Sequence, residues 1–231
     1  MAGNIPVGAI INAVAILLGG GIGLLFKGKM SDKVSGTVTR AIGLCVCIIG
    51  VSSAIYGDIM LLVVSIMLGA LVGELVDIDA RLTMLGAFLQ SKISKKESPS
   101  TFAEGFVTAT LLFCVGAMAV VGSIEGGLRN DYDIIVTKSI IDATAAMVFA
   151  SYLGFGVLFS AVTVFIYQGT IEVFAGLLQG VFTDGLITQI SAVGGLMILA
   201  LGFNMALGGK IKVANLLPGL VFAAGYYFLV M

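Results

Sequence analysis

Asp142 is the residue whose type and position first suggest chemistry. It lies near the start of the apolar stretch "SIIDATAAMVFASYLGFGVLF", residues 139–159. A carboxylate at the centre of a bilayer costs about 2.5–3.5 kcal/mol, so such a residue usually faces a cavity or a partner. It could bind a cation or a competing proton. Alternatively, Lys138 stands one helical turn earlier and could form an ion pair with it near a helix start.

Asn12 strengthens the functional interpretation of Asp142 through an internal repeat. The segment "IINAVAILL" (10–18) resembles "IIDATAAMV" (140–148), and this alignment places Asn12 opposite Asp142. "GIGLLF" (21–26) is likewise echoed by "GFGVLF" (154–159). Two oxygen-bearing side chains at equivalent positions of two repeats are expected to converge on one site, because transporters bind substrates where their repeats meet.

Weaker candidates for ion or substrate binding are other polar side chains in apolar surroundings: Gln168, Glu172, Asn204 and Asn215. Gln168 and Glu172 open a stretch, 168–184, that is interrupted by polar residues and glycine. This stretch could re-enter the membrane, lie at its surface or contain a further crossing. Pro218 cannot donate to the carbonyl of Ala214, which would leave a carbonyl free to coordinate a cation beside Asn215. A packing kink is the alternative explanation.

Glycines suggest further helix breaks and close helix contacts. The triple glycine Gly19, Gly20 and Gly21 predicts a break in the first apolar helix, as Pro218 does in the last. Small residues four apart occur at Gly19/Gly23, Gly69/Gly73 and Gly122/Gly126. This spacing lets helices approach closely and is also typical of oligomer contacts.

The composition excludes several classes of protein. The chain has 231 residues, of which 59% are hydrophobic and 11% charged, with no histidine and a net charge of −1. The missing histidine removes the commonest metal ligand and proton relay. No nucleophile–base pair or metal motif is present, so we expect no enzyme, no catalytic residues, no metal centre and no nucleic-acid partner. We expect no cofactor other than a bound Na⁺ ion.

Long apolar runs predict an all-α polytopic membrane protein with seven or eight transmembrane helices, an internal repeat and broken helices. Runs of about 18 or more apolar residues are long enough to cross a bilayer. The stretch 77–97 repeats leucine and isoleucine at helical spacing with cations on other faces, which predicts an amphipathic helix on the membrane surface. The spans are expected at about 5–26, 37–57, 59–76, 102–123, 139–167, 186–208 and 213–231.

The predicted organisation is one transmembrane domain over 1–231. Repeat one covers about 5–76, the surface helix 77–97, a linking helix 102–123 and repeat two about 137–231. Cations after the first span (Lys27, Arg40) and after the third (Arg81) place those loops in the cytoplasm and the N-terminus outside. Seven spans would leave Lys210 and Lys212 outside, whereas a further crossing within 160–184 would bring them inside.

Four blocks resemble one bacterial family. They are "IPVGAIINAVAILLGGGIGLL", "EGFVTATLLFCVGAMAVVGSIEGGL", "LGFGVLFSAVTVFIYQG" and "VANLLPGLVFA". Together they are similar to the YqgA/YdfK-like inner-membrane proteins, domain-of-unknown-function family 554, over nearly the whole chain. The family is uncharacterised, so the resemblance implies at most a sodium channel or pump and carries over no functional residues.

The expected function is therefore a small Na⁺ or H⁺ transporter or channel with a site between the two repeats. We expect it in the bacterial inner membrane, in contact with lipid, and as a homo-oligomer. Two alternatives stay open. One is a non-transporting scaffold or regulator, in which Asn12, Asp142, Gln168 and Asn215 would be paired off separately. The other is a small-solute carrier without ion coupling.

Overall fold

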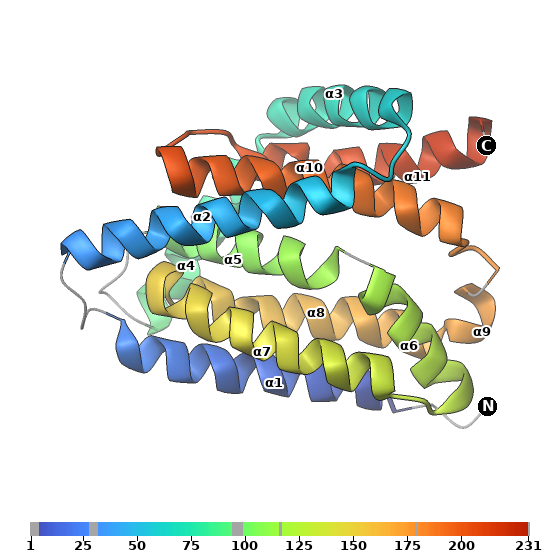
Figure 1. The fold of residues 1–231 in the computed structure, drawn as a ribbon, viewed down its shortest axis with the longest axis horizontal. Helices are drawn as coiled ribbons and strands as arrows, with labels where there is room; N and C mark the ends of the chain where they lie inside the picture. Colours follow the sequence, from blue (N-terminus) through green and yellow to red (C-terminus); the bar gives the residue numbers. More distant parts are fainter. Residues whose placement is uncertain (1–4, 28–31, 94–98, 116, 179, 231) are drawn as a thin grey trace. The chain divides into compact units, whose positions relative to one another are not determined.

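The computed structural model of this chain describes residues 5–27, 32–93, 99–115, 117–178 and 180–230, and all regular structure in them is helical (Figure 1). The elements are α1 (Val7–Phe26), α2 (Asp32–Ala54), α3 (Ile59–Val76), α4 (Ile78–Ile93), α5 (Pro99–Cys114), α6 (Ala117–Arg129), α7 (Asp133–Leu153), α8 (Gly156–Val173), α9 (Ala175–Leu178), α10 (Asp184–Leu207), the 3-10 helix η1 (Val213–Leu216) and α11 (Pro218–Val230).

The predicted class, an all-α polytopic membrane protein, is confirmed. Within the described residues, six segments are long and apolar enough to cross a membrane: α1, α3, α7, α8, α10 and η1 with α11. The pair α5 and α6 makes a seventh if its two parts, bent by 59°, form one broken span. In α2 the described apolar part, Thr39–Ala54, is shorter than this limit.

The chain forms two compact units, and the first consists of Met1–Lys29 and Glu104–Thr183. In this unit α1 packs against α7 and α8, and α6 packs against α7, α8 and α9. Figure 1 shows α7 and α8 running alongside α1. A helix from the start of the chain is thus held by helices that follow more than a hundred residues later.

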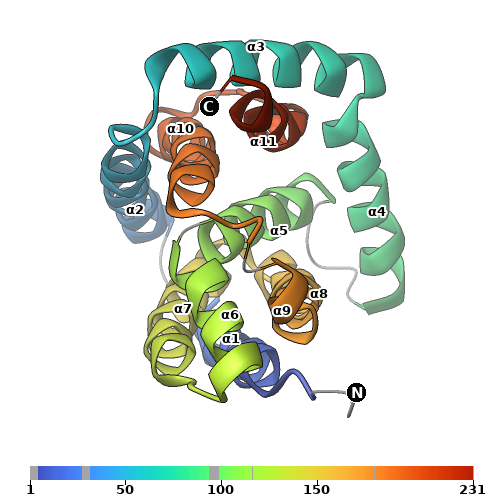
Figure 2. The ribbon, with the colours of Figure 1, turned by 90° about the vertical axis from the view of Figure 1, so that its right-hand side faces the viewer.

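The second unit consists of Met30–Ala103 and Asp184–Met231. Here α2 packs along α10, and α3 packs against α11 and η1. Figure 2 shows α2 beside α10 and α3 beside α11. Glycines allow the first contact, because a Cβ at Gly50 would lie 2.4 Å from the Leu199 backbone nitrogen and one at Gly202 2.7 Å from the Cys47 nitrogen. Backbones this close require residues without side chains.

The predicted single span 139–167 is wrong, because the chain makes two helices there. α7 ends at Leu153 and α8 begins at Gly156. Gly154 between them has φ 79°, a conformation that residues with a Cβ rarely adopt. The first two residues of the "GFGVLF" block are therefore the turn between two helices and the other four begin α8, which is itself long and apolar enough to span.

The predicted helix break at Gly19, Gly20 and Gly21 is also wrong, because α1 is continuous from Val7 to Phe26. The reason is that these glycines serve packing. A Cβ at Gly19 would lie 2.0 Å from the carbonyl oxygen of Ala143, and one at Gly23 would lie 2.1 Å from that of Met147. The close helix approach predicted from the Gly19/Gly23 spacing is confirmed within this chain.

Pro218 stands where α11 begins, directly after the 3-10 helix η1. Proline suits the first position of a helix because its missing N–H would have no intrahelical partner there. The free carbonyl predicted at Ala214 is not found, because its oxygen accepts a hydrogen bond from the Leu217 backbone nitrogen at 3.2 Å. The tight 3-10 turn supplies the donor that proline cannot.

The remaining expectations about organisation concern the surface helix, the stretch 168–184 and the two repeats. The helix predicted over 77–97 is present as α4, Ile78–Ile93, and residues 94–97 lie outside the described residues. In the uncertain stretch 168–184, α8 runs to Val173 and is followed by the short helix α9. The division into repeat one (5–76) and repeat two (137–231) stays a prediction.

Candidate cation site

Asn12 and Asp142 lie in direct contact in the first unit. Asn12 sits on α1, Asp142 on α7, and the Asn12 Nδ2 donates a hydrogen bond to Asp142 Oδ2 at 2.9 Å. The same Nδ2 donates to Oε1 of Gln168 on α8 at 3.0 Å. Three of the polar residues singled out from the sequence therefore meet where three helices pack together.

Lys138 completes this group. Its ammonium forms an ion pair and a hydrogen bond with Asp142 Oδ2, one helical turn along α7. The ion pair considered from the sequence is thus present, and it is buried: Lys138 is 6% exposed and Asp142 4%. A buried carboxylate in such surroundings requires a balancing charge and hydrogen bonds, and Lys138 and Asn12 supply both. We call Asn12, Lys138, Asp142 and Gln168 the four-residue network.

Two polar atoms of the network have no hydrogen-bond partner among the described residues. They are the Oδ1 of Asn12 and the Nε2 of Gln168, and both side chains are completely buried. The amide orientation of Asn12 follows from chemistry, because only its N–H₂ group can face the Asp142 carboxylate. A buried acceptor without a donor is costly, and an oxygen in that position is the kind of atom that coordinates a hard cation.

Glu172 lies one turn beyond Gln168 on α8 and is 1% exposed. Its carboxylate accepts hydrogen bonds from the backbone nitrogens of Gly8 at 3.1 Å and Ala9 at 3.0 Å, at the start of α1. This position favours a negative charge, because the first N–H groups of a helix lack partners within the helix. Glu172 therefore anchors α1 to α8 beside the network.

The loop residue Tyr132 lies near this carboxylate. Partial burial raises the pKa of the Tyr132 phenol, and the negative charge of Glu172 raises it further. The aromatic ring also lies against α6, where a Cβ at Gly126 would come within 3.0 Å of it. Glycine at this position therefore lets the loop before α7 pack against α6.

Asn204 and Asn215 belong to the second unit, where each is already hydrogen-bonded. Asn204 Nδ2 donates to the Ile211 carbonyl at 2.8 Å and its Oδ1 accepts from the Ile211 nitrogen at 3.0 Å. It therefore closes the loop after α10. Asn215 Nδ2 donates to Glu74 Oε2 at 2.6 Å, and its Oδ1 accepts from the Asp79 nitrogen at 2.8 Å.

Lys212 completes this second polar cluster. Its ammonium lies 2.9 Å from Glu74 Oε1 and 3.7 Å from Asp77 Oδ1. The hydrogen bond to Glu74 raises the pKa of Lys212, and the charges of Asp77, Glu74 and Asp79 add to this. Because the ion pair is exposed to solvent, it contributes little stability and mainly positions the ends of α3 and η1.

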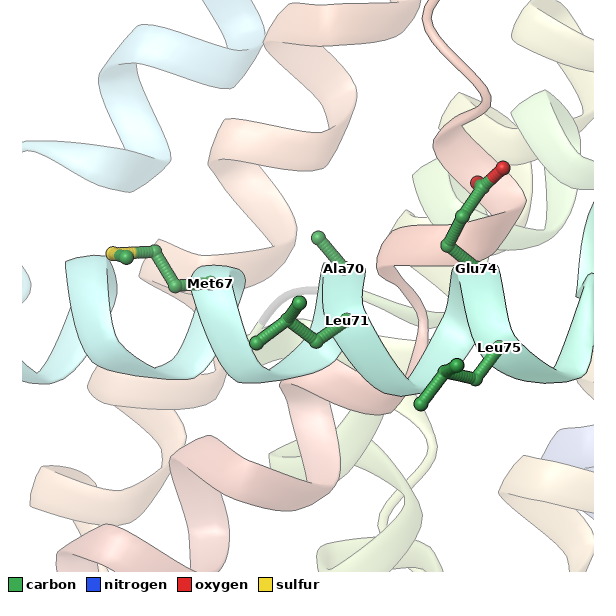
Figure 3. Close-up of a pocket in the computed structure, with 5 residues that line it drawn as sticks. All are labelled: Met67, Ala70, Leu71, Glu74 and Leu75. Atoms are coloured by element: carbon green, nitrogen blue, oxygen red, sulfur yellow. The ribbon is translucent and has the colours of Figure 1, made fainter.

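A surface hollow of about 590 Å³ runs along α3, lined by Met67, Ala70, Leu71, Glu74 and Leu75 (Figure 3). Its lining is apolar apart from Glu74, whose carboxylate stands at one end of it in the figure. None of the binding residues predicted from the sequence lines it. An apolar outer face is expected of a helix that borders lipid.

The sequence singled out the members of the four-residue network but missed two roles. It did not indicate that Glu172 caps α1, although the spacing of four between Gln168 and Glu172 matches that between Gly8 and Asn12. Residues four apart share one helix face, so two such pairs can form two successive contacts between the same two helices. It also did not indicate that Glu74, exposed at the end of α3, bonds Lys212 and Asn215.

The fold and this network define a polytopic helical membrane protein with a buried ion pair on α7, where α1 and α8 pack against it. Among the described residues no three His, Cys, Asp or Glu side chains gather at one point, so oxygen atoms of amides and a single carboxylate are the available ligands. The sequence matches the family described as "Protein of unknown function (DUF554)" over residues 7–228, and the chain belongs to this family.

Relatives extend over nearly the full chain. The chain is 33% identical to the "Uncharacterized membrane protein YdfK" of Bacillus subtilis (strain 168), an alignment that covers 93% of this chain and 92% of the relative. It is 30% identical to the "Uncharacterized protein YqgA" of Escherichia coli (strain K12), with 94% of each covered. No solved structure matches. The resemblance seen in the sequence is therefore confirmed.

Proposed function

We propose that this protein moves a small cation, Na⁺ or H⁺, across the bacterial cytoplasmic membrane, and that Asp142 binds the cation. The observation that carries the proposal is the contact of Asn12, Asp142 and Gln168 inside the first unit, with two buried polar atoms left unpaired. A purely structural cluster usually satisfies its buried polar groups, because each unpaired group costs about 1–3 kcal/mol. A bound cation would use the free oxygen of Asn12.

The test of this proposal is ion flux in proteoliposomes. Wild-type protein is expected to carry ²²Na⁺, or protons reported by a pH-sensitive dye, well above empty liposomes. Asp142→Asn keeps the shape and removes the charge, so it is expected to lower flux at least about tenfold, the effect of 1.4 kcal/mol. Glu125→Gln, on an exposed ion pair of α6, is the matched control and should retain wild-type flux. Equal and significant flux in wild type and Asp142→Asn would sink the proposal.

The proposed topology has eight crossings with the N-terminus outside. Two observations support it: α8 is a separate apolar helix, and α2 packs along α10, which is long enough to span. If α2 crosses with α10, and α5 with α6 forms one span, the cationic loops at Lys27, Arg81 and Lys210 all lie on one side. This distribution agrees with the excess of Lys and Arg in cytoplasmic loops.

Cysteine labelling checks this topology. In a background without the three native cysteines, Asp131→Cys is expected to react with a membrane-impermeant maleimide in intact cells. Lys210→Cys is expected to react only after the membrane is permeabilised. Both positions are exposed in the structure, so poor access within the protein would not confound the result. Labelling of both positions from the same side would contradict eight crossings.

A non-transporting scaffold is the second candidate. It is favoured by Asn204 and Asn215, whose side-chain amides are each hydrogen-bonded within the second unit. In that case α4 would be the element that docks a cytoplasmic partner. Wild-type protein without flux of Na⁺ or H⁺ would favour this function over transport. Homo-oligomer formation stays a prediction under either function.

A further inference from the structure

We propose that Lys138 is a tethered competitor for the cation: its ammonium occupies the Asp142 carboxylate in the resting state, and a monovalent cation binds only by displacing it. This inference rests on the proposed function and assigns Lys138 a positioning role within the same site. The geometry points to it because Lys138 and Asn12 both bond the same oxygen, Oδ2 of Asp142. A cation that takes this oxygen must therefore replace the Lys138 ammonium.

The charge balance of the network selects the valence of the ion. Asp142 carries one negative charge, Lys138 one positive charge, and the side chains of Asn12 and Gln168 are neutral. Because all four are buried, exchanging Lys138 for one monovalent cation keeps the site neutral. A divalent cation would leave a net positive charge in a medium of low dielectric, which is strongly unfavourable. Glu172 is not counted among these charges, because it lies one turn further along α8, where the N–H groups that begin α1 stabilise its carboxylate.

The ligands suit a metal ion better than they suit the lysine. Asn12 presents its Oδ1 without a donor, and among the described residues Lys138 bonds Asp142 and not this oxygen. A cation such as Na⁺ or K⁺ prefers several oxygen atoms around it. Here the Asp142 carboxylate supplies them from α7, and Asn12 Oδ1 supplies another from α1 once its amide turns over as the ammonium leaves. Displacement of Lys138 thus exchanges a contact with one oxygen for a site with several.

A displaced Lys138 side chain can extend toward the start of α7. It lies close to the start of α7, which begins at the exposed Asp133. Five residues of helix rise by roughly 7–8 Å, a span that the four-carbon stem of lysine covers when it extends toward an interface. Side chains on a helix also point toward its N-terminus, which is the direction of Asp133. The ammonium can therefore leave the carboxylate and reach solvent beside the start of α7 without moving α7.

The experiment measures cation binding to the purified protein in detergent. The readout is the shift of the thermal unfolding midpoint with cation concentration. NaCl and, in parallel, KCl are titrated against choline chloride at constant ionic strength. Lys138→Met removes the competitor while keeping the length of the stem. If the lysine holds the carboxylate 90–99% of the time, its removal is expected to lower the apparent dissociation constant for Na⁺ or K⁺ about 10- to 100-fold. CaCl₂ is expected to give no comparable shift.

The control variants separate the two proposals. Lys138→Arg keeps the charge and should bind the cations no more tightly than wild type. The double variant Lys138→Met, Asp142→Asn leaves no buried charge unpaired, so it should fold and show no cation-dependent shift. An unchanged affinity in Lys138→Met, or equal stabilisation by Ca²⁺, would overturn the tethered competitor alone. Cation binding that survives in the double variant would overturn Asp142 as the site and with it the proposed function.

If Lys138→Met fails to fold, flux provides the readout in its place. Lys138→Arg is then compared with wild type in proteoliposomes at rising Na⁺ or K⁺. A guanidinium binds a carboxylate through two hydrogen bonds and therefore more tightly than an ammonium does. In Lys138→Arg the half-saturating cation concentration is expected to be about tenfold or more above that of wild type. An unchanged half-saturating concentration would mean that Lys138 does not compete.

Discussion

Gly19→Ala is expected to lower the thermal unfolding midpoint by about 2–12 °C, whereas Gly21→Ala, two positions further along the same helix, is expected to leave it unchanged or raise it. The difference follows from what each new Cβ would meet. At Gly19 it would lie 2.0 Å from the Ala143 carbonyl oxygen, and at Gly21 nothing lies within 4 Å. Backbone cannot rotate away as a flexible side chain can, so α1 and α7 must separate.

The size of the effect comes from the cost of overpacking. An inserted methyl group in a tight contact destabilises by about 1–3 kcal/mol, and one kcal/mol shifts the midpoint of a protein of this length by about 2–4 °C. Alanine is also a better helix former than glycine, which is why Gly21→Ala is not expected to be harmful. Scanning fluorimetry of both variants in one detergent measures the difference. Similar midpoints would mean that α1 does not pack this closely on α7.

Glu172→Ala is expected to lower the midpoint by about 6–24 °C. The substitution removes the acceptor for the Gly8 and Ala9 nitrogens, which are bonded at 3.1 and 3.0 Å. Hydrogen bonds to charged groups contribute about 1.5–3 kcal/mol each, and the start of α1 also loses a favourable negative charge. The same melting experiment reports the change. Glu172→Gln keeps the volume and one acceptor oxygen, so it should fall between Glu172→Ala and wild type.

Glu125→Ala is the matched comparison for this variant. Glu125 bonds Arg129 one turn along α6, where the arginine side chain is 69% exposed. An exposed pair of this kind contributes at most about 1 kcal/mol, so the midpoint should move by less than about 4 °C. If Glu172→Ala were no more harmful than Glu125→Ala, the carboxylate would not be holding α1.

The membrane class and the members of the buried network could be predicted from sequence, because apolar surroundings leave few alternatives both for long apolar runs and for charged side chains. A run of 18 apolar residues has few alternatives to crossing a bilayer. A carboxylate in such a run needs a partner, and Asp142 has Lys138 and Asn12. The alignment of "IINA" with "IIDA" therefore paired two residues that do touch, 130 residues apart in sequence, although the repeat itself stays a prediction.

The helix boundaries could not be predicted as well, because glycine has two uses that look alike in sequence. At Gly154 it permits φ 79° and ends α7, whereas at Gly19 and Gly23 it admits a neighbouring backbone while α1 continues. Only the tertiary contact separates the two cases. The same limit applies to Ala214, whose carbonyl was expected to be free. Its donor, the Leu217 nitrogen, reaches it only because the chain adopts a 3-10 turn, which the sequence did not indicate.

The assembly of the first unit from distant segments has a consequence for synthesis of the protein. Asn12 enters the membrane with α1, but Asp142 and Gln168 follow 130 and 156 residues later. At about 5–20 residues per second, Asn12 waits roughly 7 to 26 s for Asp142 to be made. During that time its buried amide and the bare start of α1 have no native partner, so the nascent chain depends on the translocon, on lipid headgroups or on a chaperone to hold α1 until α7 and α8 arrive.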